Sequence, residues 1–157
     1  GDKGISVGEN SQLYAVNNKL VGNSIGVQSK DRSTAILLNQ TFTNNKTALH
    51  AYKKNWRYGE GGTIFLAKSV VSGGQVSATA KKRSAIQIFD SYLEIPAKGK
   101  RVDTIAVDDD HSRSALHDDL LPDPGLVDSR LMDQLENIPA DLLEHITPDR
   151  RGSAIDG

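Results

Sequence analysis

One segment of the sequence concentrates the residue types that bind sugars. The stretch AYKKNWRYGEGG, residues 51–62, holds the only Trp, two of the four Tyr, three basic residues and three Gly. Aromatic rings can stack on sugar rings while neighbouring Lys and Arg bind carboxylate or sulfate groups. The alternative is an aromatic clasp that packs back on the protein, with the glycines supplying turns. The first interpretation makes these residues ligand-binding candidates: Tyr52, Lys53, Lys54, Trp56, Arg57 and Tyr58.

Three charged runs, which we call the basic stripe, recur at one phase of a sequence repeat: Lys30, Asp31 and Arg32; Lys53 and Lys54; Lys81, Lys82 and Arg83. If successive copies of the repeat stack at about 4.8 Å, these runs lie side by side and suit a polyanion. The alternative is a solvated column of turns whose lysines discourage edge-to-edge aggregation. The first interpretation adds Lys81, Lys82 and Arg83 to the ligand-binding candidates.

Catalytic and metal-binding patterns are weak in this sequence. The region up to Val102 has only six scattered Asp and Glu, and the absence of Cys excludes thiolate chemistry. His50 with Tyr52 and Lys53 would suit a lyase base and its electrostatic partners, but a lone His on a strand is commonly structural. Residues 108–119 hold two His and five Asp, whose spacing matches neither an EF-hand nor a zinc-protease helix. We therefore expect no catalytic residue, metal or cofactor, and interpret residues 108–119 as a solvated acidic linker.

The region up to Val102 is built from copies of one sequence repeat, with a period of about 22 residues. GISVGENSQLYAV, from Gly4, aligns with GVQSKDRSTAILL, from Gly26. The aligned pairs are Ser11 with Ser33, Leu13 with Ala35, Ala15 with Leu37, Val16 with Leu38, Asn17 with Asn39, Leu20 with Phe42, and Asn23 with Asn45. A third copy begins near Ala48 and accommodates about seven extra residues before Ile64, Leu66, Lys68 and Val71 resume the pattern; a fourth spans residues 78–94.

The repeat predicts short strands. Apolar residues alternate, as in Leu13 and Ala15 or Ile86 and Ile88, which is the period of a strand with one buried face. Because no helical period intervenes, we expect an all-β solenoid of about four 22-residue coils, in which each strand pairs with its equivalent in the next coil. An antiparallel sandwich is the alternative, although it does not require the same residue type at the same phase.

Two pairs of Asn occupy equivalent positions of the repeat. We expect Asn17 to stack on Asn39 and Asn23 on Asn45, so that their amides satisfy one another. Asn39 and Asn45 also begin N-glycosylation acceptor sequences, which is the alternative reading of these two residues.

The sign of the charge divides the chain. Residues 1–102 carry 15 Lys and Arg against 6 Asp and Glu, whereas residues 103–157 carry 4 against 14. We therefore predict β coils over 1–102 and an acidic extension over 103–157, which contacts the basic stripe of its own molecule or of a neighbouring one. Within the extension, Val127, Leu131, Leu135 and Ile138 predict one amphipathic helix, and residues 142–146 a second short one. These helices either cover the solenoid or dock onto a partner.

The segments GISVGENS, IGVQSKDRS, NNKTALHAYKKN and SAIQIFDS resemble the right-handed parallel β-helix repeat proteins over roughly residues 3–95. The sequence looks most like the β-helix segments of exported or surface-displayed bacterial proteins, some adjoining spore-coat-H-like kinase domains. That resemblance implies a secreted or cell-surface bacterial protein. It does not fix an activity, since the fold carries lyases, hydrolases, epimerases and adhesins.

These observations predict a non-catalytic structural or binding module for an acidic polysaccharide or a protein partner. A fragment of a pectate-lyase-like polysaccharide lyase or epimerase is the alternative. No nucleic-acid partner is expected, and no apolar run is longer than the four residues Ala35 to Leu38, which are too few to span a membrane. Because four coils are few for a solenoid, we expect the sequence to belong to a larger chain or assembly.

Overall fold

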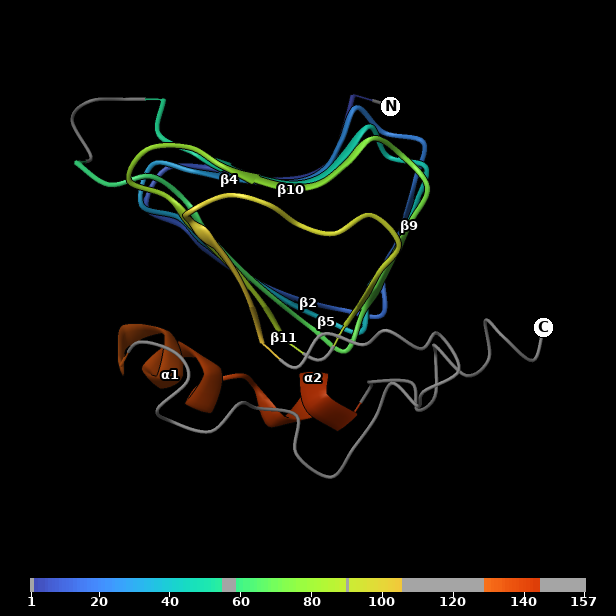
Figure 1. Cartoon of the computed structure of the whole chain (residues 1–157). Coiled ribbons are helices and arrows are strands. Elements are labelled where there is room, and N and C mark those ends of the chain that lie inside the picture. The colour runs from blue at the N-terminus through green and yellow to red at the C-terminus, as the bar shows by residue number, and fades with distance from the viewer. Residues whose placement is uncertain (1, 55–58, 90, 106–128, 145–157) are drawn as a thin grey trace.

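The computed structural model describes residues 2–54, 59–89, 91–105 and 129–144. Its strands form three parallel sheets (Figure 1). Sheet A contains β1 (Lys3–Val7), β4 (Ile25–Lys30), β7 (Thr47–Tyr52) and β10 (Val76–Ala80). Sheet B contains β2 (Gln12–Val16), β5 (Thr34–Leu38), β8 (Thr63–Ala67), β11 (Ala85–Phe89) and β13 (Val102–Ile105). Sheet C contains β3 (Lys19–Val21), β6 (Thr41–Thr43), β9 (Val70–Ser72) and β12 (Tyr92–Leu93). The predicted all-β class, with parallel strands, is confirmed.

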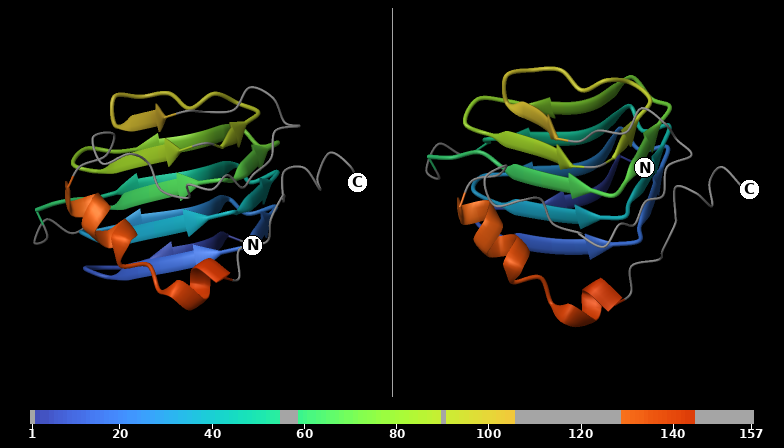
Figure 2. Two further views of the ribbon diagram at one scale, coloured as in Figure 1. Left: turned by 90° about the horizontal axis from the view of Figure 1, so that it is seen from below. Right: turned by 60° about the horizontal axis from the view of Figure 1, so that its bottom comes forward.

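Successive strands go to different sheets, and from β4 to β12 each strand lies beside the strand three places before it (Figure 2). We call three successive strands, one in each sheet, a circuit. Lys3 pairs with Ile25, and Ile25 pairs with Thr47, in both cases at the spacing of the sequence repeat. Thr47 pairs with Val76, which lies farther along the chain because the insertion intervenes. The predicted register of the repeat, and the position of the insertion within it, are therefore confirmed.

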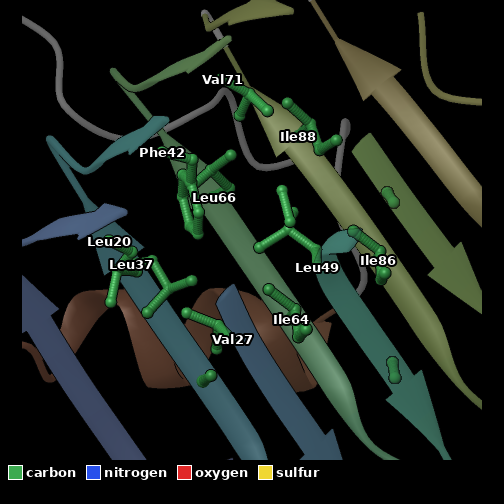
Figure 3. Packing of buried hydrophobic residues seen from close by; sticks show 14 of the residues in the cluster. Leu20, Val27, Leu37, Phe42, Leu49, Ile64, Leu66, Val71, Ile86 and Ile88 are labelled. Atoms are coloured by element: carbon green, nitrogen blue, oxygen red, sulfur yellow. The ribbon is translucent and has the colours of Figure 1, made fainter. Parts of the chain in front are cut away.

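The sheets enclose an aliphatic core because alternate side chains of each strand point inward. Figure 3 shows residues from all three sheets converging, among them Val27, Leu37, Phe42 and Ile64, each with 0% of its surface exposed. Burial of one such side chain stabilises the fold by roughly 1.5–3 kcal/mol. Neighbouring circuits repeat these contacts because their registers match, as in the pairing of Ala35 with Ile64.

Both Asn pairs stack across circuits, as predicted. Asn39 donates from Nδ2 to Oδ1 of Asn17 at 2.9 Å, and Asn23 donates in the same way to Asn45 at 3.0 Å. Asn17 and Asn39 have φ angles of 59° and 55°, a left-handed conformation that Asn tolerates better than most residues. Asn39 and Asn45 are 0% and 2% exposed, so in the folded protein their amides are inaccessible for glycosylation.

Helices α1 (Ser129–Glu136) and α2 (Ala140–Glu144) cover the outer face of sheet B (Figures 1 and 2). Leu135 and Ile138 pack there in a cluster with Ile36 and Phe65. The hydroxyl of Tyr14 donates a hydrogen bond to the carbonyl of Gln134, at 3.2 Å. The first of the two predicted roles, covering the sheets, is therefore confirmed for Leu135 and Ile138.

Other predictions for the extension concern residues that lie wholly or partly outside the described ranges. Val127 and Ile146 are not described, nor are the side chains of Leu131 and Leu143. The predicted contact with the basic stripe stays a prediction, because residues 106–128 lie outside the described ranges. Among the helices that the structure describes, none has the length and apolar character needed to cross a membrane.

The last described strand completes a shortened circuit. Ile86 of β11 pairs with Val102 of β13, which follows it along the chain by less than one full repeat. Before β13 the chain passes across the end of the stack (Figure 1), where Ala97 and Val102 pack against the core. The predicted boundary between residues 102 and 103 therefore falls inside β13, and sheet B extends to Ile105.

Candidate functional site: the outer face of sheet A

The outer face of sheet A is concave, because the sheet bows toward the axis of the stack (Figure 1). Two rows of outward side chains cross its strands. The first row is Ser6, Gln28, His50 and Thr79, which are paired in the registers of the four strands. In the second row Lys30 pairs with Tyr52, and Lys81 follows directly after β10. Strand alternation positions both rows because their neighbours Val27, Leu49, Ala51 and Ala78 belong to the core.

An aromatic pair lies in the middle of this face. The rings of His50 and Tyr52 stack with their centroids 4.8 Å apart and their planes 11° from parallel. Both residues are partly exposed. Stacking covers one face of each ring, so the face of Tyr52 turned away from His50 is the one left for a ligand beside Lys30. Gln28, which is 3% exposed, donates from Nε2 to Oγ of Ser6 at 3.1 Å and contributes an ordered polar group next to the rings.

The electrostatic environment of His50 is positive. Burial lowers the pKa of His50 below its usual value of 6.5, and the positive charges of Lys81 and Lys3 lower this pKa further. Lys3 belongs to the first circuit and Lys81 to the fourth, whereas His50 belongs to the third. Lysines from circuits on both sides therefore act on one ring, and an anion bound there would be attracted by both.

The lowered pKa of His50 predicts a pH-dependent stability. Well above about pH 6.5 the ring is neutral in both the folded and the unfolded states and adds no pH dependence to the free energy of unfolding. As the pH falls below about 6.5, the unfolded state binds the proton first, so stability decreases until the pH lies below the folded-state pKa. We expect His50→Gln to remove this decrease, measured by urea unfolding at about pH 5 and about pH 7.5. The same pH dependence in both proteins would contradict it.

The basic stripe occupies the corner between sheets A and B. Arg32 donates its backbone N–H to the carbonyl of Gly61 at 3.0 Å, and Gly61 donates to that of Arg83 at 2.7 Å, so these three residues form one column across circuits. Lys54, Lys81, Lys82, Arg32 and Arg83 are exposed, and Lys30 and Lys53 are partly exposed. Asp31 is the exception, since its side chain is 0% exposed.

The insertion between β7 and β8 is held at both of its described ends. The Asp31 carboxylate accepts the backbone N–H of Lys54 at 2.7 Å. On the returning side, Nη1 of Arg83 donates to the carbonyl of Gly59 at 3.2 Å. Arg83, predicted as a ligand residue, therefore also anchors the insertion. Trp56, Arg57 and Tyr58 lie outside the described residues, so the choice between sugar platform and aromatic clasp stays open for them.

The structure brings the described candidates together, namely Tyr52, Lys53, Lys54, Lys81, Lys82 and Arg83, where sheet A meets the corner. It adds Lys3, Gln28 and Thr79, which sequence reasoning did not select. For Gln28 and Thr79 the signal was available, because each occupies the outward phase of a strand whose inward residues were recognisable. Lys3 shares the sequence phase of Ile5 and Val7, which face the core, so alternation did not reveal it. His50, considered only as a catalytic base, belongs to the same face.

Two other regions contribute less to a site. Within the described ranges, no three His, Asp or Glu side chains gather as metal ligands, and the acidic segment 108–119 lies outside those ranges. An open groove of about 460 Å³ follows the corner between sheets C and A, lined by polar residues and glycines that include Asn23, Lys46 and Gln75. It has no aromatic surface and one lysine, so it is a poorer candidate for an acidic sugar polymer.

Comparison with known proteins returned no match to any family model, curated protein or solved structure. The function therefore has to be inferred from the geometry and charge of the described surface.

Proposed function

We propose that the protein is a non-catalytic binding module that holds an acidic polysaccharide on the outer face of sheet A and the adjoining basic stripe. In this proposal the three sheets are the faces of a right-handed parallel β-helix, and the polymer runs along its axis. The proposal includes export to, or display at, a bacterial cell surface, as the resemblance of the sequence implies.

The observation that carries the proposal is the stacked His50–Tyr52 pair beside lysines of neighbouring circuits. The ring face of Tyr52 that His50 leaves uncovered suits the apolar face of a pyranose, and the lysines suit its acidic substituents. Parallel strands space these groups at about 4.8 Å, so a linear polymer can meet equivalent groups on successive circuits. A partner protein with an acidic surface is the alternative ligand, but its binding to the lysines would not require an aromatic ring beside them.

Tyr52 provides the test of stacking. We expect Tyr52→Ala to weaken binding of hyaluronan or polygalacturonate about threefold to tenfold, since an exposed aromatic contact contributes about 0.5–1.5 kcal/mol. Tyr52→Phe retains the ring and should bind within about twofold of the wild type. Isothermal titration calorimetry at fixed salt concentration measures both.

Tyr92→Ala is the matched control, because Tyr92 lies in β12 of sheet C, away from the proposed surface. Its affinity should equal that of the wild type. Equal losses in the Tyr52 and Tyr92 variants, or no binding of either polymer by the wild type, would contradict the proposal.

A lyase or epimerase remains the second candidate because the lowered pKa keeps His50 neutral, and therefore able to accept a proton, at neutral pH. Tyr52 and Lys81 on the same face would supply the neighbouring polar groups. Incubation with acidic polysaccharides, followed by ultraviolet absorbance of unsaturated uronate ends, separates a lyase from a binder. A binder releases no product, whereas a lyase produces absorbance that His50→Gln abolishes.

A further inference from the structure

Two columns of side chains on this surface carry a cation in circuits two and four and none in circuit three. In the outward row of sheet A, Lys30 of circuit two pairs with Tyr52 of circuit three. In circuit four Lys81 donates its backbone N–H to the carbonyl of Ala51, at 2.9 Å, so it lies on the far side of Tyr52 from Lys30. The two lysines are therefore two circuits apart, about 10 Å along the stack.

A second column repeats this alternation. Arg32 and Arg83 flank Gly61, to which both are joined by backbone hydrogen bonds of 3.0 and 2.7 Å. Gly61 is required there, because a Cβ atom would lie 1.9 Å from Oγ of Ser84 and 3.0 Å from the Arg83 carbonyl oxygen. Circuit three is thus uncharged in both columns, with a ring in one and a glycine in the other.

Lys53 and Lys54 bring positive charge to circuit three, but not within either column. They begin the insertion, and the Lys54 backbone is held by the Asp31 carboxylate at 2.7 Å. Their charges add to the general attraction for a polyanion, whereas the two columns give that attraction a period along the stack.

We propose that the polymer presents one acidic group to the protein for every two sugars. An extended, diequatorially linked pyranose chain advances by about one circuit spacing per sugar. A sugar stacked on Tyr52 then places its two neighbours beside Lys30 and Lys81. Two sources share this chemistry: an alternating copolymer of acidic and neutral sugars, and a twofold ribbon whose successive acidic groups point to opposite edges. This inference rests on the proposed function and specifies its ligand class.

Three polymers of matched length test the inference: hyaluronan, which alternates acidic and uncharged sugars; cellulose-derived polyglucuronate, a twofold ribbon; and polygalacturonate, a diaxially linked chain with a different repeat. We expect calorimetry to give hyaluronan or polyglucuronate about tenfold higher affinity than polygalacturonate at equal salt. Whichever of the first two binds more tightly identifies the source.

Substitutions on the protein then test the period itself. Tyr52→Lys puts a cation on all three circuits of the row and should shift the preference toward polygalacturonate. Lys81→Gln, at an exposed position, should weaken binding to the preferred polymer about threefold without that shift. If affinity follows total polymer charge alone, and Tyr52→Lys leaves the ranking unchanged, the inference is overturned and the proposed function stands. Binding of none of the three polymers would overturn both.

Discussion

Replacing Gly62 by alanine is expected to lower the free energy of unfolding by about 3 kcal/mol, because the added methyl group collides with backbone rather than with a movable side chain. A Cβ atom on Gly62 would lie 2.0 Å from the carbonyl oxygen of Ser29 and 2.7 Å from the backbone nitrogen of Lys30. Both belong to the preceding circuit, so relief would require the circuits to separate. Urea unfolding followed by circular dichroism measures the loss.

Gly8→Ala is the matched control for this experiment. Gly8 lies at the same corner of the first circuit, its φ is ordinary, and a Cβ atom there would meet nothing within 4 Å. Its stability should stay within about 0.5 kcal/mol of the wild type. If the Gly62→Ala variant is as stable as the Gly8→Ala variant, the circuits do not pack as closely at this corner as the structure indicates.

Reversing two charges on the outer face of sheet A should have the largest effect on binding. We expect Lys30→Glu with Lys81→Glu to weaken binding of an acidic polysaccharide about a hundredfold, because attraction becomes repulsion on both sides of Tyr52. The loss should shrink at high salt, where screening weakens both attraction and repulsion. Calorimetry at two salt concentrations provides the measurement.

The control for net charge is Lys19→Glu with Lys46→Glu. Both residues are exposed, and they lie in sheet C and at the corner between sheets C and A. This pair changes the net charge by the same amount but should alter affinity by less than about threefold. Equal losses in the two double variants would mean that the polymer responds to net charge and not to sheet A.

The repeating part of this structure was predictable, because each copy of the sequence repeat forms the same strands with equivalent residues at equivalent positions. Leu13 aligns with Ala35 in the sequence and pairs with it in the sheet, since parallel in-register strands place equivalent residues together. The insertion also follows from sequence, because Ile64 can resume the apolar phase of Ala35 only after it.

Features that depend on tertiary packing were harder to predict from the sequence. The run Ala35 to Leu38 does not alternate in sequence, and the structure gives the reason: all of β5 is buried, with α1 and α2 covering the outer face of its sheet. The shortened circuit that ends in β13 has no repeat to reveal it. Strand alternation alone could not show that Gln28, on the outward phase, would be 3% exposed on a concave sheet.

The candidate site was partly predictable for similar reasons. The basic residues recur in phase, so their gathering at one corner follows from the repeat. The buried Asp31, and the hydrogen bond of Arg83 to Gly59, depend on how the insertion packs against its neighbouring circuits. The stacking of His50 on Tyr52 places the first aromatic residue of segment 51–62 on the face of sheet A. Sequence reasoning had grouped these two residues only as candidates for a lyase site.

An NMR titration of the isotopically labelled protein with an acidic oligosaccharide tests most directly whether an acidic polysaccharide binds on the outer face of sheet A. We expect the amide shift changes to centre on Gln28, Lys30, His50, Tyr52 and Lys81. Changes confined to the groove of Asn23, Lys46 and Gln75, or a spectrum unchanged by excess ligand, would contradict it.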